Sequence, residues 1–196
     1  MKVVATMIAL IINFCAHSQS LSPRNWIDSQ MYYTDVSGNA FSITHSLPKG
    51  GGTYTDTTGI TYSYVVFWYC ITNTAQVPLE VALQFPVTKY QIFNSKESHI
   101  RIVLPSETMT ADKIELFDYG LANLKDYLDS EFNNSSTLDI TIPPNKDYYF
   151  YSSVLMHQVN GSARAAFILE DQKLVYEIKI GENANLVSCG KIRFYE

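Results

Sequence analysis

The sequence predicts a mainly β fold, an immunoglobulin-like β-sandwich with one amphipathic α-helix. Aromatic residues, which favour strands, are abundant: the chain of 196 residues holds 14 Tyr and 10 Phe. Apolar and polar residues alternate over many short segments, and turn signals separate these segments at short intervals. Such a pattern is satisfied when two sheets pack face to face.

The chain begins with a predicted secretion signal, residues 1–18. Lys2 supplies a positive charge, the apolar run Val3–Phe14 follows, and Ala16-His17-Ser18 matches the small-x-small cleavage pattern. Gln19 is then the first mature residue. The alternatives are a buried N-terminal helix or an uncleaved anchor, but the run is short for a hydrocarbon core about 30 Å thick.

Cys15 raises the alternative of a lipoprotein. The bacterial lipidation signal prefers a small residue before the cysteine, and here that residue is Phe14. We therefore expect residues 19–196 to be released as a single domain, secreted or periplasmic, with no integral membrane segment.

The overall composition fits a globular chain that does not bind nucleic acid. Hydrophobic residues make up 46% of the sequence and charged residues 17%, which suits a chain with a sizeable core. The formal net charge is −5, and it becomes −6 when the leader with its single Lys is removed. A mildly acidic chain without clusters of Lys and Arg repels phosphate backbones.

Two turns with the same chemistry predict hairpins in the first third of the mature chain. In Asp35–Gly38 and in Asp56–Gly59, the Asp side chain can accept backbone hydrogen bonds and the Gly can adopt positive φ. Pro48–Gly52 lies between the two and predicts a flexible connection with a bulge.

The strongest predicted strand is Ile60–Asn73. Both of its faces are apolar or aromatic, which predicts a central strand covered on both sides. Asn160-Gly161 and Asp171-Gln172 predict two further hairpins. The other expected strands are 79–85, 98–104, 138–142, 148–159, 162–170, 173–180 and 191–196.

One helix is expected, from Ala111 to about Ser130. Its apolar residues recur at intervals of three and four and so form one stripe, with Thr110 as a plausible N-cap. Gly120 in the middle costs about 1 kcal/mol relative to Ala, and it marks close packing or a break.

Two cysteines, Cys70 and Cys189, remain after the leader is removed. In an oxidising compartment they are candidates for a disulfide. The alternative is a pair of free buried thiols, because the sequence does not place the two Cα atoms within reach of each other.

An exposed aromatic platform is the candidate binding site. Sugars and peptides stack on such surfaces, and aromatic residues are enriched in interfaces. The alternative is that these side chains fill the core. The candidate residues are Tyr62, Tyr64, Trp68, Tyr148, Tyr149 and Tyr151.

The sequence shows no motif for catalysis, metal binding or a cofactor. The mature histidines, His45, His99 and His157, have no second ligand at the short spacing that zinc sites use. Asp35 and Asp56 each stand alone, unlike the spaced acids of a calcium loop. We predict no metal site and no cofactor.

Strand carboxylates are the remaining catalytic candidates. A pair held roughly 5–10 Å apart can hydrolyse glycosides. Glu80, Asp139 and Glu177 alternate with apolar residues and so resemble ordinary solvated side chains.

Six segments together carry a resemblance to known proteins: His45–Gly51, Phe67–Asn73, Pro78–Val81, Leu116–Leu124, Phe150-Tyr151 and Ala163–Ala165. With these segments, the chain resembles uncharacterised exported proteins of Bacteroidota-type bacteria. The resemblance covers most of residues 26–196 and implies bacterial export, but that family has no established activity and implies no mechanism. The string from Asn73-Thr74 to Pro78-Leu79 is also similar to a strand–turn–strand unit of immunoglobulin-like sandwiches.

Three functions follow from the sequence as hypotheses. The first is a non-catalytic binding or interaction module of the cell envelope, with an unknown protein or glycan partner. The second is a carbohydrate-binding protein that uses the aromatic platform. The third is a glycoside hydrolase that uses strand carboxylates.

Overall fold

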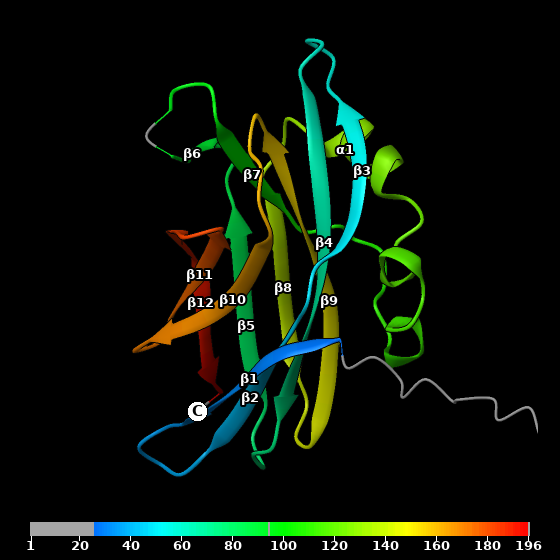
Figure 1. Ribbon diagram of the computed structural model, residues 1–196. Helices are drawn as coiled ribbons and strands as arrows, with labels where there is room; N and C mark the ends of the chain where they lie inside the picture. Colours follow the sequence, from blue (N-terminus) through cyan, green and yellow to red (C-terminus); the bar gives the residue numbers. More distant parts are fainter. Residues whose placement is uncertain (1–25, 94, 196) are drawn as a thin grey trace, which may run out of the picture.

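The computed structural model describes residues 26–93 and 95–195 (Figure 1). The expected signal sequence, residues 1–18, lies outside these described residues. The fold is mainly β, as predicted: among the described residues, strands hold 57% and helices 9%. All strand pairs are antiparallel, and they form two sheets.

The larger sheet, sheet A, has the strand order β1-β2-β4-β9-β7-β6. β3 and β2 share one side of β4, because β3 pairs with the first half of β4 and β2 with the second half. The strands are β1 (Ile27–Thr34), β2 (Ala40–Ser46), β3 (Lys49–Thr55), β4 (Thr61–Asn73), β6 (Tyr90–Gln91), β7 (His99–Val103) and β9 (Lys146–His157).

The smaller sheet, sheet B, has the order β10-β11-β12-β5-β8. It packs on one face of sheet A, and the two sheets enclose the shared core, to which both contribute buried residues. The strands are β5 (Leu79–Phe85), β8 (Ser136–Ile142), β10 (Ala163–Glu170), β11 (Lys173–Ile180) and β12 (Asn183–Phe194).

The chain between β7 and β8 forms the helical segment, residues 104–135, which covers the other face of sheet A (Figure 1). Side chains of this segment and of sheet A enclose a second cluster, the outer core. No helix in the described part of the chain has the length and apolar character needed to cross a membrane. The helices are η1 (Ala111–Lys113), η2 (Phe117–Gly120) and α1 (Leu124–Glu131).

The prediction for the central strand is confirmed. β4 lies between β2 and β3 on one side and β9 on the other. Phe67 and Tyr69 lie in the shared core, whereas Trp68 and Cys70 lie in the outer core. Both faces of β4 are apolar, and both are covered, because exposing either face would leave apolar side chains in water.

Both Asp turns are also confirmed. The N–H of Gly38 donates to the carbonyl of Asp35, and the N–H of Gly59 donates to that of Asp56. The Asp35 carboxylate accepts from the N–H groups of Ser37 and Asn39, at 2.9 and 2.8 Å. The predicted turn at Asp171-Gln172 joins β10 and β11.

The prediction of one long helix over 111–130 is wrong. The only α-helix in the described residues is α1, and the chain before it forms two short 3-10 helices. Asp118, Tyr119 and Gly120 have φ of 45°, 57° and 70°, which is left-handed backbone that a right-handed helix cannot contain. The apolar stripe exists because the whole segment faces sheet A, whatever its local backbone.

The prediction of a hairpin at Asn160-Gly161 is wrong as well. β9 belongs to sheet A and β10 to sheet B, so this turn carries the chain across the shared core. The final strand starts at Asn183 rather than at 191. It passes through Gly190, where a Cβ would lie 2.0 Å from the carbonyl oxygen of Ala82 on β5. A glycine that looks like a strand breaker is therefore a site of close strand approach.

The disulfide prediction is also wrong, because Cys70 and Cys189 are both free and buried. Cys70 faces the outer core and Cys189 faces the shared core, so sheet A separates the two thiols. The alternative of two free buried thiols describes the structure. Burial raises the pKa of the Cys189 thiol to about 12, which makes it a poor nucleophile.

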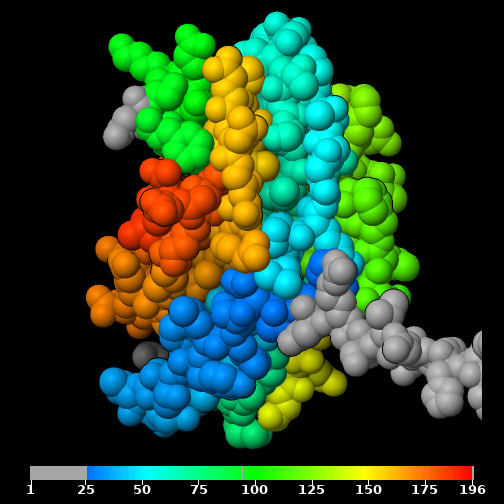
Figure 2. All heavy atoms as spheres, in the orientation of Figure 1, coloured from blue at the N-terminus to red at the C-terminus, as the bar shows by residue number. Residues whose placement is uncertain are grey.

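Side chains of sheet A protect the open edge of β10. The N–H of Phe167 donates to Nε2 of His45 at 3.1 Å, and the N–H of Leu169 donates to the Tyr33 hydroxyl at 3.4 Å. An exposed edge strand is a template for unwanted pairing, and these contacts occupy it. They also bring the β1–β2 hairpin against β10 (Figure 2).

Candidate functional site

A groove of about 730 Å³ opens where the β1–β2 hairpin, the β10–β11 turn and the end of β12 meet. Its volume is within the range of small-molecule sites. The end of β12 lies beside the same hairpin in Figure 1. The apolar and aromatic side chains that line the groove are Tyr33, Val36, Phe41, Val77, Leu169, Ile192, Phe194 and Tyr195.

Three of these rings form a connected aromatic wall. Tyr33 stacks on Phe41 with ring centres 5.1 Å apart, and Phe194 meets Phe41 edge-on at 5.9 Å. The hydrogen bond to Leu169 fixes the hydroxyl of Tyr33. Tyr195, at the rim, is 60% exposed. The groove therefore offers both a fixed aromatic surface and an accessible ring.

Carboxylates dominate the polar rim. Glu80 is held by Arg193, whose Nε donates to it at 2.8 Å. Asp35 stabilises its own turn, and the side-chain hydrogen bond from Asn39 is the main cause that lowers the pKa of its carboxyl. With Asp171, the rim carries three acids against one base. This balance disfavours anionic ligands.

The predicted aromatic platform is not formed. Tyr62, Trp68 and Tyr151 are at most 2% exposed and lie beneath the helical segment, which excludes them from any exposed surface. Trp68 and Tyr151 are direct partners across β4 and β9, so they face the same side and are covered together. The alternative that these side chains fill the core is correct for them.

The remaining platform candidates are half-buried and lie on different faces. Tyr64 and Tyr149 pack against the outer core, and Tyr148 packs against the shared core. The end of the Tyr64 ring lies over Gly52, so a side chain at position 52 would displace this ring. The six residues thus make no common surface.

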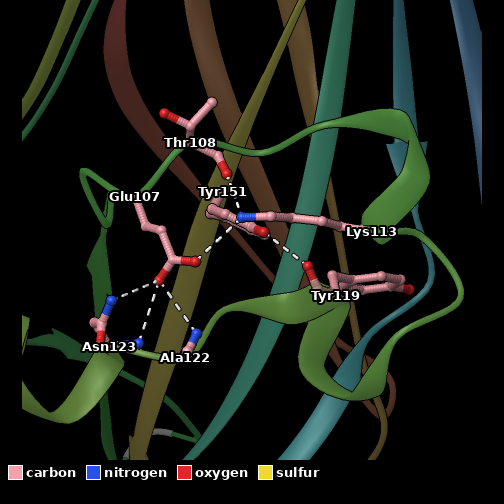
Figure 3. A network of polar contacts seen from close by, with 7 residues as sticks. All are labelled: Glu107, Thr108, Lys113, Tyr119, Ala122, Asn123 and Tyr151. Carbon is pink, nitrogen blue, oxygen red and sulfur yellow. Dashed lines mark hydrogen bonds and ion pairs between the residues drawn. The ribbon is translucent and has the colours of Figure 1, made fainter.

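A network of polar contacts holds the helical segment over these aromatic rings (Figure 3). One oxygen of Glu107 accepts from the N–H groups of Ala122 and Asn123 at 3.1 and 3.2 Å, directly before α1. Its other oxygen pairs with Lys113 at 3.2 Å. Glu107 therefore acts as a distant N-terminal cap for α1.

Tyr151 and Lys49 fasten this cover to the sheet with three further hydrogen bonds. Tyr151 donates its hydroxyl hydrogen to the carbonyl of Tyr119 at 2.7 Å (Figure 3). Lys49 on β3 donates to the carbonyls of Ile114 and Leu116 at 2.7 and 2.8 Å. These hydrogen bonds join side chains of the segment and of the sheet to backbone groups, so the network holds the segment in place.

The carboxylates proposed for catalysis lie on the outer face of sheet B. Glu80 and Asp139 share a shallow hollow of about 260 Å³ with Lys191 and Arg193. Glu177 lies on β11 and pairs with Lys179 at 2.8 Å. These side chains occupy one open face and do not oppose each other across a cleft, as glycoside hydrolysis requires.

The histidines have separate roles. His45 is fully buried and bridges Ser29 and Phe167. His99 and His157 come from different strands, and their ring centres lie 5.0 Å apart. Sequence reasoning missed this pair because its search was confined to short spacings. Within the described residues there is no group of three or more acidic, His or Cys side chains that could hold a metal ion.

The groove residues were missed for a similar reason. Tyr33 and Phe41 flank the first Asp turn, and Leu169 precedes the turn of β10 and β11. Phe194 is the last residue of β12, and Tyr195 follows it directly. These residues share one feature in the sequence. Each is apolar or aromatic and lies near the end of a strand, where a residue exposed to solvent would be polar.

The comparisons with known proteins give no relative. No family model, no curated protein and no solved structure matches this chain.

Proposed function

We propose that the chain is an exported, non-catalytic binding module of the bacterial cell envelope, and that its groove binds a short stretch of glycan. The observation that carries the proposal is the groove of about 730 Å³, with its aromatic wall and polar rim. The proposed aromatic binding site therefore consists of other residues than those predicted from the sequence, and it lies at one end of the two sheets.

The chemistry of the groove suits a neutral sugar. A sugar ring has apolar C–H faces that stack on aromatic rings, and Tyr33, Phe194 and Tyr195 offer such rings. Its hydroxyl groups can donate to a carboxylate or bond an amide, and Asp171 and Gln172 supply both at the rim. The excess of acids disfavours phosphorylated or acidic ligands.

The contacts of the strand carboxylates support binding rather than hydrolysis. Arg193 holds Glu80 and Lys179 holds Glu177 in ion pairs on an open face. The immunoglobulin-like character of the fold and the secreted or periplasmic location remain parts of the proposal. The leader in residues 1–18 and the resemblance to exported proteins support the location.

A glycan array with residues 19–196 tests the proposal. We expect binding to a defined set of neutral glycans. Tyr195→Ala should weaken that binding about tenfold, a loss typical of removing one well-placed ring. The backbone hydrogen bond from Tyr195 to Pro78 does not use the ring and is kept.

Tyr32→Ala is the matched control. Tyr32 is 76% exposed. It lies next to the groove residue Tyr33 on β1 but does not line the groove itself. It should bind like the unaltered protein. Silence across the array, or equal losses in both variants, would contradict the proposed site.

A further inference from the structure

We propose that His99 and His157 form a binding site for a divalent transition-metal ion, independent of the groove. The two residues are direct partners across β7 and β9. Both side chains lie on the face of sheet A that carries the outer core. Tyr62 lies beside them on the next strand, β4, and its ring centre is 5.7 Å from each imidazole.

Backbone carbonyls fix the tautomer of both histidines. Nδ1 of His99 lies 3.0 Å from the carbonyl oxygen of Glu97, and Nδ1 of His157 lies 2.8 Å from that of Thr61. Because a carbonyl oxygen only accepts, each Nδ1 carries the proton and each Nε2 keeps a lone pair. The Nε2 of His99 accepts a long hydrogen bond from the Tyr62 hydroxyl at 3.4 Å, which a bound ion would displace. Metal-binding histidines are oriented in this way, with the second ring nitrogen donating to a carbonyl or carboxylate.

The separation of the rings fits a shared ion. A metal bound to an imidazole nitrogen at about 2.0–2.1 Å lies about 3.2 Å from the centre of that ring. Two rings arranged around one ion at a near-tetrahedral angle are then about 5 Å apart. The observed separation of the ring centres is 5.0 Å. Both residues are only half-buried, so solvent and ions can reach them.

The charges around the pair select the kind of ion. Desolvation is the main cause that lowers the pKa of His99, and the nearby Lys89 and His157 lower it further. Lys89 lies over the Tyr62 ring, and Arg101 lies two residues along β7.

These cations and the absence of a carboxylate ligand from the pair disfavour calcium and magnesium. Ions that prefer imidazole, such as Zn²⁺, Ni²⁺ and Cu²⁺, fit the two nitrogens, with water completing the coordination. The positive charge of Lys89 should weaken the site. Replacing Lys89 with a neutral residue should therefore raise the affinity for the metal ion, whereas replacing either histidine should lower it.

Calorimetric titration of the untagged full chain with Zn²⁺ at pH 7.5 tests the inference. We expect one ion per chain. His99→Gln and His157→Gln should each weaken Zn²⁺ binding by at least about tenfold. Removing a residue that only hydrogen-bonds to a metal ligand already costs about ten- to a hundredfold in affinity, and these two residues are the proposed ligands themselves. Lys89→Gln should tighten binding. His17 and His45 remain in every variant and provide a constant background.

Gln is chosen because its amide can still donate to the carbonyl that each histidine uses. A far-ultraviolet circular dichroism spectrum checks that each variant is folded. Binding that is equally tight in the double variant, or a Lys89→Gln variant that binds more weakly than the unaltered chain, would overturn the inference.

Discussion

At the scale of single residues, His45 shows how one side chain joins the two sheets. It is fully buried, its Nδ1 pairs with Ser29, and its Nε2 accepts from the backbone of β10. An Nε2 that accepts must be unprotonated, so the folded protein requires neutral imidazole. Burial is the main cause that lowers the pKa of His45 to about 4.

This requirement predicts a loss of stability in mild acid. The unfolded chain binds the His45 proton near pH 6.5, whereas the folded chain binds it only near pH 4. The contribution is therefore fully present above pH 6.5 and is lost as the pH falls through this window, by roughly 3 kcal/mol in total. Urea unfolding at a series of pH values measures it.

His45→Gln provides the comparison for this prediction. Its amide oxygen can accept the N–H of Phe167 but does not titrate, so its free energy of unfolding should change much less between pH 6.5 and 4. Parallel pH profiles for the two proteins would contradict the role given to His45.

Residue-scale features were predictable where their partners are close in the chain. Asp35 and Asp56 bond atoms within four residues, and a turn motif contains all the information needed. His45 depends on Phe167, which is distant in sequence, and no local pattern announces that contact.

At the scale of elements, Gly190 controls the approach of β12 to β5. Gly190→Ala should lower the free energy of unfolding by about 3 kcal/mol or more, because its Cβ would overlap the Ala82 carbonyl, which is rigid backbone. The urea midpoint is the measurement.

Gly51→Ala is the control that separates the cost of this overlap at Gly190 from the cost of backbone strain. Gly51 also has positive φ, at 123°, but its Cβ would meet nothing within 4 Å. It should cost only about 1–2 kcal/mol. Equal losses in the two alanine variants would show that the overlap at Gly190 is relieved without cost.

The cap of α1 gives a second prediction at this scale. Glu107→Ala removes the acceptor of the N–H groups at Ala122 and Asn123, together with the ion pair to Lys113. We expect a loss of about 1–2 kcal/mol in urea unfolding. Glu182→Ala, in the exposed turn before β12, should stay within about 0.5 kcal/mol of the unaltered protein. A Glu107 variant as stable as this control would contradict the capping role.

Strands were predicted better than the helix for a physical reason. Alternation in β4 reports which side each residue faces, and the prediction that both faces are covered is confirmed. The stripe over 111–130 also reports burial, but burial against a sheet does not require continuous helix. Three left-handed residues interrupt it, and Gly120 was their only sequence signal.

At the scale of the whole molecule, the two cysteines report on the layering. Sheet A separates Cys70 from Cys189. Alkylation of residues 19–196 in denaturant without reductant should therefore add two groups by mass. A product that adds none would mean that the thiols are joined, which this arrangement of sheets does not allow.

The groove is a property of the whole molecule and of no single element. Tyr33, Phe41, Leu169 and Phe194 come from four strands in two sheets, and they meet because both sheets end at the same place. The sequence predicted that aromatic residues would matter. It did not indicate which ones, since the richest aromatic segment forms the interior of sheet A.

Amide chemical-shift mapping with a glycan selected from the array tests the central claim most directly. We predict the largest shifts for residues 33–41, 169–172 and 192–195, with little change at Asp139 and Glu177 on the outer face of sheet B. Shifts centred on that outer face or on the helical segment would contradict a binding site at the end of the two sheets.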